Sequence, residues 1–248
     1  MMMLRRLLVL GLAALVIPAC HNDGSSGSGA GSGNGAPVAL FLNPAYVDYI
    51  PGDDGSEGNN LEYALPALGY SNLVFSGITD ADFAAVLTKR TRALVIPELE
   101  DGDLFPDLSD SAQDVIRTYV QRGGLLIGFL SSTDFLNVVN GIFGFSIDAP
   151  NSLGTAAITP AAGGTPFAGG PATLPYNDDT SVMDPASLPA GALTIYADDN
   201  TGEPALVVIP FGQGHIVIFG YDWYDGAPFG VQDGGWLEVL GRALNLGR

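Results

Sequence analysis

The chain has 248 residues, 47% of them hydrophobic, so it can bury the core of one moderate domain or two very small ones. It contains 27 acidic and only nine basic residues. A surface this acidic repels nucleic acid and anionic lipid headgroups, and we expect neither as a partner of the folded part. It attracts cations, although acidity also serves simply to keep an exported protein soluble. The single cysteine excludes an intramolecular disulfide.

Residues 1–19 have the features of a signal peptide. Arg5 and Arg6 precede an apolar run, Leu7 to Ala19, which is shorter than the roughly 20 residues that a membrane-spanning helix needs. Cys20 follows directly. The segment resembles the lipobox of bacterial lipoproteins, in which the cysteine receives a diacylglycerol and becomes the new N-terminus. We therefore expect lipidation at Cys20; the alternative is an ordinary secretory signal followed by an incidental cysteine.

Residues 20–36 are expected to form a tether between this anchor and the folded part. Positions 23 to 35 contain no apolar residue larger than alanine, so they cannot offset the entropy of an ordered backbone. A flexible segment of this length separates its ends by roughly 20 Å. The resemblance to lipoproteins implies an exported protein held in the cell envelope through its lipid, and His21 after the cysteine indicates the outer membrane.

The mature domain, residues 37–248, begins with a strand at 38–42, whose residues are continuously apolar. Leucines and alanine at helical spacing predict a helix at 61–68, which Gly69 ends. A second strand is expected at 73–75. A helix that carries Phe83, Val86 and Leu87 follows, with Thr79 as its N-cap.

The clearest unit is a strand at 92–97, an acidic loop, and a helix capped by Ser109 with one apolar face from Ala112 to Val120. A continuously apolar strand at 125–130 follows, and a helix that starts at Thr133 or Asp134 comes next. Alternating strands and helices at this spacing indicate βαβ units. The predicted fold class is therefore α/β: a three-layer, doubly wound, mostly parallel sheet.

The pattern weakens between residues 145 and 189, which are rich in glycine, proline and alanine. Strands are expected again at 193–196, 205–209 and 215–219. The last two are joined by a tight glycine turn as a C-terminal β-hairpin. Apolar spacing from Trp236 to Leu244 predicts a closing helix.

Three stretches resemble the class I glutamine amidotransferase-like superfamily, which has a flavodoxin-like fold: 93–97, 115–127, and 211–223 with the helix after it. Catalytic members have a cysteine on the turn after the central strand and a histidine from late in the chain. This chain has Phe129-Leu130-Ser131-Ser132 at that turn and no cysteine after Cys20. A thiolate nucleophile is thus excluded. His215 lies within an apolar strand and is expected to be structural, and the two serines to cap a helix.

Ligands of open α/β sheets bind beyond the carboxyl ends of the strands, where this sequence places many acids. The loop acids are Asp48, Asp53, Asp54 and Glu57 in the first loop, Glu98, Glu100, Asp101 and Asp103 in a second, and Asp134 in a third. Clustered carboxylates suit calcium, but no stretch fits an EF-hand loop, so calcium is an option and no metal ligands are assigned. Aromatic and acidic side chains around Trp223 could bind a sugar or peptide, or pack as core. The expected ligand-binding residues are Asn43, Glu98, Asp101, Ser131, Asp134, Asp222, Trp223 and Asp225.

These patterns predict a non-catalytic binding or scaffolding domain on a lipid anchor. The alternative is an envelope hydrolase that acts on carbohydrate or amide substrates through carboxylates at the carboxyl edge of the sheet. An enzyme requires carboxylates that converge on one point, whereas a binding surface would have its acids spread into solvent.

Overall fold

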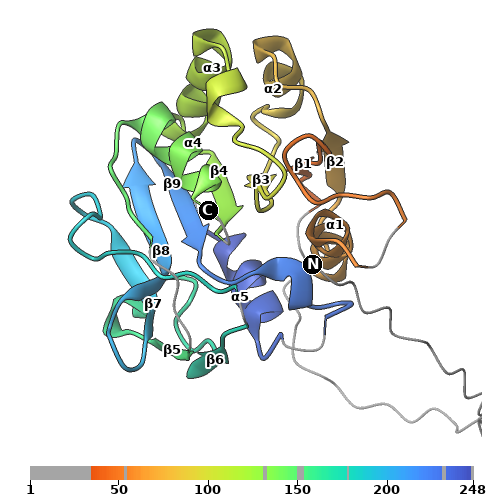
Figure 1. Cartoon of the computed structure of the whole chain (residues 1–248). Helices are drawn as coiled ribbons and strands as arrows, with labels where there is room; N and C mark the ends of the chain where they lie inside the picture. The colour runs from red at the N-terminus through yellow and green to blue at the C-terminus, as the bar shows by residue number, and fades with distance from the viewer. Residues whose placement is uncertain are drawn as a thin grey trace, which may run out of the picture. The chain divides into compact units, whose positions relative to one another are not determined.

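The computed structural model describes residues 35–52, 55–130, 133–149, 154–177, 179–230 and 233–246 (Figure 1). Among these residues, none of the helices has both the length and the hydropathy to cross a bilayer. The strands are β1 (Val38–Phe41), β2 (Asn72–Phe75), β3 (Leu94–Ile96), β4 (Leu125–Phe129), β5 (Thr155–Ile158), β6 (Thr173–Pro175), β7 (Leu193–Asp198), β8 (Pro204–Phe211) and β9 (Gly214–Phe219). The helices are α1 (Glu57–Ala67), α2 (Asp80–Val86), α3 (Asp110–Gln121), α4 (Asp134–Phe143) and α5 (Trp236–Ala243), with short 3₁₀ turns η1 (Phe105–Asp107), η2 (Pro160–Ala162) and η3 (Trp223–Asp225).

All nine strands join one mixed sheet in the order β2-β1-β3-β4-β9-β8-β7-β5-β6 (Figure 1). The half from β2 to β9 is parallel, and every pair from β9 to β6 is antiparallel. The expected α/β class is confirmed, but the expectation of a mostly parallel sheet is wrong. The hairpin from β8 to β9 reverses the strand direction, and β7, β5 and β6 continue antiparallel beyond it.

The parallel half contains the strands that apolar runs predicted. Every residue of β1, β3 and β4 is buried, as is typical of strands covered on both faces. The predicted starts of α2 and α3 are also found, whereas α1 begins at Glu57, four residues before the predicted helix. Thr79 and Asp82 form a reciprocal capping box at α2, and the hydroxyl of Ser109 accepts a hydrogen bond from the amide of Ala112 at α3. These local signals position the connections between the parallel strands.

Residues 145–189 supply two strands, β5 and β6, that apolar periodicity did not predict. Both are short, and only one residue of each is fully buried, so neither has an apolar run. Two backbone bonds tie the end of this segment to the central sheet: Ser181 N–H to Gly220 O at 2.7 Å and Met183 N–H to Pro204 O at 2.8 Å. The segment therefore extends the sheet by pairing and not by burying a large apolar face.

An aromatic cluster anchors the chain that leaves β9. The rings of Tyr221 and Trp236 stack at 4.8 Å, and Trp223 makes an edge contact with Phe129 at 5.2 Å. These side chains are fully buried. The contacts join η3, β4 and α5, so the segment after β9 has a fixed place at the carboxyl edge of the parallel strands.

Gly220, directly after β9, accommodates this close packing. A Cβ atom there would overlap the carbonyl oxygen of Ser181, whose own amide bonds to Gly220. We expect Gly220→Ala to lower the free energy of unfolding by about 1–3 kcal/mol, because backbone must shift to make room. Urea unfolding measures this loss. Gly35→Ala is the matched control, since a Cβ at Gly35 meets no atom within 4 Å; equal stability of the two variants would contradict the prediction.

Candidate functional site

The order of the strands reverses between β1 and β3, and we call the region at the carboxyl ends of these two strands the crevice. From β1 the chain adds β2 on one side, and β3 then joins β1 on the other side. In open α/β sheets, ligands bind at the carboxyl ends of strands where the order reverses in this way. The segment after β1 leads into α1, and the segment after β3 contains Glu98 and Glu100. These two segments face each other across the crevice.

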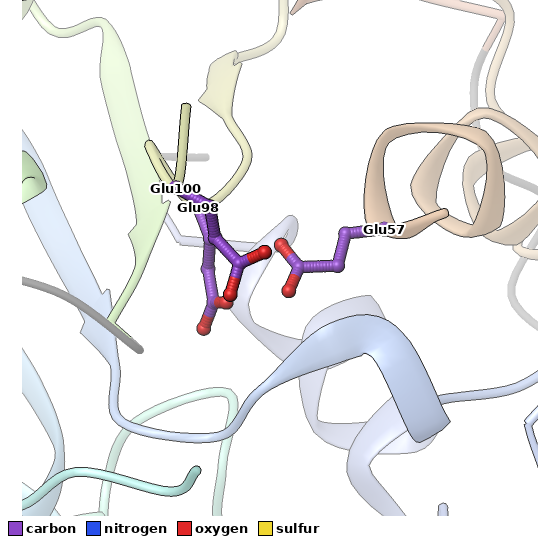
Figure 2. A group of neighbouring side chains, drawn as sticks. All are labelled: Glu57, Glu98 and Glu100. Carbon is purple, nitrogen blue, oxygen red and sulfur yellow. The ribbon is translucent and has the colours of Figure 1, made fainter. Parts of the chain in front are cut away.

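Three glutamates meet at this point (Figure 2). Each of Glu57, Glu98 and Glu100 offers a carboxylate oxygen, and these oxygens lie within 4.8 Å of one another. Glu57 is the first residue of α1, and the other two follow β3. Figure 2 shows the Glu57 side chain reaching toward Glu98 from the opposite side. The carboxylates therefore converge and are not spread into solvent.

Burial distinguishes the three acids. Glu57 is 1% exposed and Glu98 is 0% exposed, whereas Glu100 is exposed. The Glu57 Oε2 atom has no hydrogen-bond partner among the described residues. A buried carboxylate without such a partner is costly, because it has lost its hydration shell. The position of Glu57 in the first turn of α1 offsets part of this cost through the positive end of the helix dipole.

Polar contacts from α1 hold the start of the helix against neighbouring segments. The Asn60 side-chain amide donates to the carbonyl oxygens of Trp223, at 2.8 Å, and of Gly226. The backbone N–H of Gly58 donates to Asp48 O at 3.0 Å, and Asn59 donates to Ile50 O at 2.7 Å. Glu57 is thus attached to a fixed scaffold and does not sit on a free loop.

The charged groups that act on Glu57 are all acidic. Burial raises the pKa of Glu57 well above its ordinary value. The negative charge of Glu98, a side-chain hydrogen bond with Glu98, and the negative charges of Asp222 and Glu100 raise that pKa further. Two unit charges about 4.8 Å apart repel by about 3–4 kcal/mol at an effective dielectric constant of about 20. Glu57 and Glu98 are therefore not both ionised without compensation, and a proton or a cation is the compensating charge.

Two of the expected ligand-binding residues belong to this region. Glu98 is a member of the carboxylate group. Asp222 is buried, accepts a hydrogen bond from the Tyr224 amide at 2.7 Å, and contributes charge to Glu57. Trp223 is different: its ring is fully buried among Phe129, Phe219 and Tyr221. Its expected role as a stacking surface does not fit the structure, because the aromatic cluster covers the ring.

The other expected residues lie apart from the carboxylate group. Asn43 closes the turn after β1 through bonds to Ala45 N–H and Ser76 O. Asp101 is exposed. Asp134 starts α4, and burial, followed by the charge of Asp103, raises its pKa. Asp225 is the last residue of η3, and Ser131 lies outside the described residues.

The expected ligand-binding residues did not include three exposed aromatic side chains on α1, η3 and the loop after η3. Tyr63 on α1 is 46% exposed, Tyr224 in η3 is 54% exposed, and Phe229 in the following loop is 39% exposed. The rings of Tyr63 and Phe229 make an edge contact at 4.7 Å. Tyr63 lies six residues, or about 9 Å, along α1 from Glu57. The available signal was that Tyr224 lies within the aromatic and acidic segment already suspected, and that Phe229 follows that segment.

His215 lies at the opposite edge of the sheet. It pairs with Leu125 at the start of β4, whereas Phe219 pairs with Phe129 at the end. Four residues of strand separate His215 from Phe219, a distance of about 13 Å along β9. Burial lowers the pKa of His215. The imidazole therefore lies far from the carboxyl end of β9.

A surface pocket of about 590 Å³ lies between α2 and α3. Its lining includes Leu87, Tyr119 and Gly124, and Gly124 directly precedes β4. The pocket is thus at the amino ends of the parallel strands, away from the converging glutamates. Burial raises the pKa of Tyr119 to about 12, so this phenol stays neutral. We assign no chemistry to this pocket.

The sequence matches no protein-family model and no curated protein. Several solved structures share the fold. The N-terminal domain of mmIFT52 superposes with a TM-score of 0.55 at 11% identity, over 85% of this chain and 98% of that one. A cytoplasmic protein of Salmonella typhimurium, STM3548, gives 0.51 at 16% identity over 76% and 86%. A ThuA-like protein from Bacteroides uniformis gives 0.50 at 11% identity over 88% and 92%. At these identities the likeness extends to the fold alone.

Removing the charge of Glu57 should stabilise the protein at alkaline pH. Because the pKa of this acid is higher in the folded than in the unfolded state, its contribution is present at low pH and lost as the pH rises through the folded value. In chelator, we expect Glu57→Gln to raise the free energy of unfolding at pH 8 by about 1–3 kcal/mol, with a smaller difference at pH 5. Urea unfolding at both pH values measures this.

Glu62→Gln on the same helix is the control, since Glu62 lies outside the carboxylate group. It should change stability little at either pH. The prediction is contradicted if Glu57→Gln is no more stable than wild type at pH 8, because the ionised carboxylate would then not destabilise the folded state.

Proposed function

We propose that this chain is a lipoprotein of the cell envelope, exported, anchored through Cys20 and sorted to the outer membrane. Its domain is a doubly wound, three-layer relative of the class I glutamine amidotransferase-like proteins that lacks their cysteine. The domain binds a ligand at the carboxyl edge of its sheet and does not carry out a reaction. Support comes from the parallel order β2-β1-β3-β4 and from the composition of residues 1–36.

One observation favours binding over catalysis: the converging acids are buried. A general acid or base must come within about 3 Å of the atom that it protonates or deprotonates. Glu57 and Glu98 have almost no exposed surface, so a sugar or peptide reaches neither of them in this conformation. Catalysis by a cysteine and histidine pair is not supported either, because the domain has no cysteine and His215 lies at the amino end of β9.

The proposed ligand surface, here called the rim, consists of exposed side chains on α1, on the segment after β9 and after β3. Tyr63, Tyr224 and Phe229 present aromatic faces, and Glu100 presents a carboxylate. Aromatic rings with nearby hydrogen-bond acceptors suit sugar rings and peptides, since the rings stack on apolar faces and the carboxylate accepts hydrogen bonds. A carbohydrate or a peptide is the proposed ligand class. The strongly acidic surface argues against nucleic acid.

The second candidate is a hydrolase, and the convergence of Glu57 and Glu98 favours it. A raised pKa on one of two close carboxylates is the arrangement of an acid and its partner in glycoside hydrolysis. This candidate requires a movement that exposes both side chains to the substrate. We rank it second because the contacts of Asn60 hold α1 closed against η3.

The lipid anchor is tested by Cys20→Ala. Wild-type protein expressed in a bacterial host should incorporate labelled palmitate and fractionate with membranes, whereas the variant should incorporate none and accumulate uncleaved. Ser28→Ala in the tether is the control and should behave as wild type. Equal labelling of wild type and Cys20→Ala would leave an ordinary secretory signal as the explanation.

The ligand surface is tested on a Tyr63→Ala, Tyr224→Ala double variant. With panels of envelope glycans and peptides, we expect binding by the wild type and a loss of about 10-fold or more in affinity in the double variant, because each stacking contact contributes about 0.5–1.5 kcal/mol. Leu193→Ala removes an exposed apolar side chain on β7 and should leave binding unchanged.

The same panels separate the two candidate functions. Turnover of a glycoside or amide by the wild type that is lost in both Glu57→Gln and Glu98→Gln would establish the hydrolase. Binding without turnover supports the binding domain. Binding that the double variant retains fully would place the ligand elsewhere on the molecule.

A further inference from the structure

The crevice has the properties of an ion site, independently of any ligand at its rim. Three carboxylates contribute oxygens within 4.8 Å of one another, two from buried side chains. Oxygens that bind one ion can be separated by at most twice the metal–oxygen distance. For calcium this span is about 4.6–5.2 Å, and for magnesium it is about 4.0–4.2 Å. The spread of the three glutamates therefore falls within what calcium admits.

A second observation concerns Glu57 alone. Its Oε2 atom is buried, has no hydrogen-bond partner among the described residues, and belongs to a side chain directed at the other two acids (Figure 2). An acid that only serves solubility would point into water, where hydration is free. This one is instead withdrawn from water and aimed at like charges. A cation between the carboxylates would satisfy the atom and remove the repulsion.

A third observation concerns the sign of the charges that act on Glu57. The charged groups that act on Glu57 are Glu98, Asp222 and Glu100, all of them acidic. A divalent ion therefore reduces this local negative charge.

We propose that Glu57, Glu98 and Glu100 form a calcium-binding site at the carboxyl ends of β1 and β3. Glu57 and Glu98 are the buried ligands, and Glu100 is the ligand on the solvent side, where the ion enters. Calcium takes six to eight oxygens, so carboxylates that bind with one or both oxygens leave places for water. The ion bridges α1 to the segment after β3 and so ties two elements that are far apart in sequence.

The test uses the full chain, stripped of metal with a chelator. Calcium at about 100 times its dissociation constant should raise the melting temperature of the wild type by about 5–10 °C, and calorimetry should give one site per chain. Magnesium at equal concentration should have a smaller effect. Terbium bound in place of calcium should show luminescence sensitised by the tryptophans.

Glu57→Gln and Glu98→Gln should each weaken calcium binding at least about 10-fold and remove most of the temperature shift, because each loses a charged ligand. Circular dichroism in chelator verifies that both variants fold. Glu62→Gln, on the same helix but outside the group, should keep the wild-type shift. The proposal is overturned if calcium leaves the wild type unchanged, or if it shifts all three variants as it shifts the wild type, which would mean diffuse attraction to an acidic surface. Neither result depends on whether a glycan or peptide binds at the rim.

Discussion

The opposition of two buried glutamates, Glu57 and Glu98, is the constraint on which the carboxyl edge of this domain depends. Each has lost its water, and the charges that act on Glu57 are negative. Such a pair is stable only when a proton or a cation lies between its members. The hydrogen bond of Asn60 and the aromatic cluster around Trp223 hold the two carboxylates in place despite the unfavourable free energy of their burial. An arrangement that opposes folding locally and is nevertheless held rigidly is typical of a functional site.

The same constraint links the two proposals without making one depend on the other. Occupation of the crevice by calcium would fix α1 relative to the segment after β3, and α1 also carries Tyr63 at the proposed ligand rim. Glu100 is the one member of the group that solvent reaches. An ion would thus shape the surface that meets the ligand, whereas a proton would neutralise the pair without joining the two segments.

The sequence predicted the parallel half of the fold because its signals are local. Continuous apolar runs identified β1, β3 and β4, and capping residues identified the starts of α2 and α3. The antiparallel extension was missed where these signals are absent, since β5 and β6 bury one residue each and are held by backbone pairing. Trp223 shows a further limit. An aromatic residue beside acids suits both a core and a binding surface, and only the tertiary packing selects between them.

The site itself illustrates why composition is a weak guide to function in an acidic protein. Asp101 and Asp134 were as plausible as Glu98 on residue type and on their position after a strand, yet only Glu98 joins the converging group. Glu98 joins the group because of a contact between segments far apart in the sequence. β3 pairs with β1, so the loop after β3 lies next to the helix that follows β1. Glu57 belongs to the group because it is the first residue of α1. The apolar spacing that predicted this helix begins only at Leu61, four residues later. The informative property of Glu57 and Glu98 is therefore that both are buried and face one another. The periodicity of the sequence does not predict this arrangement.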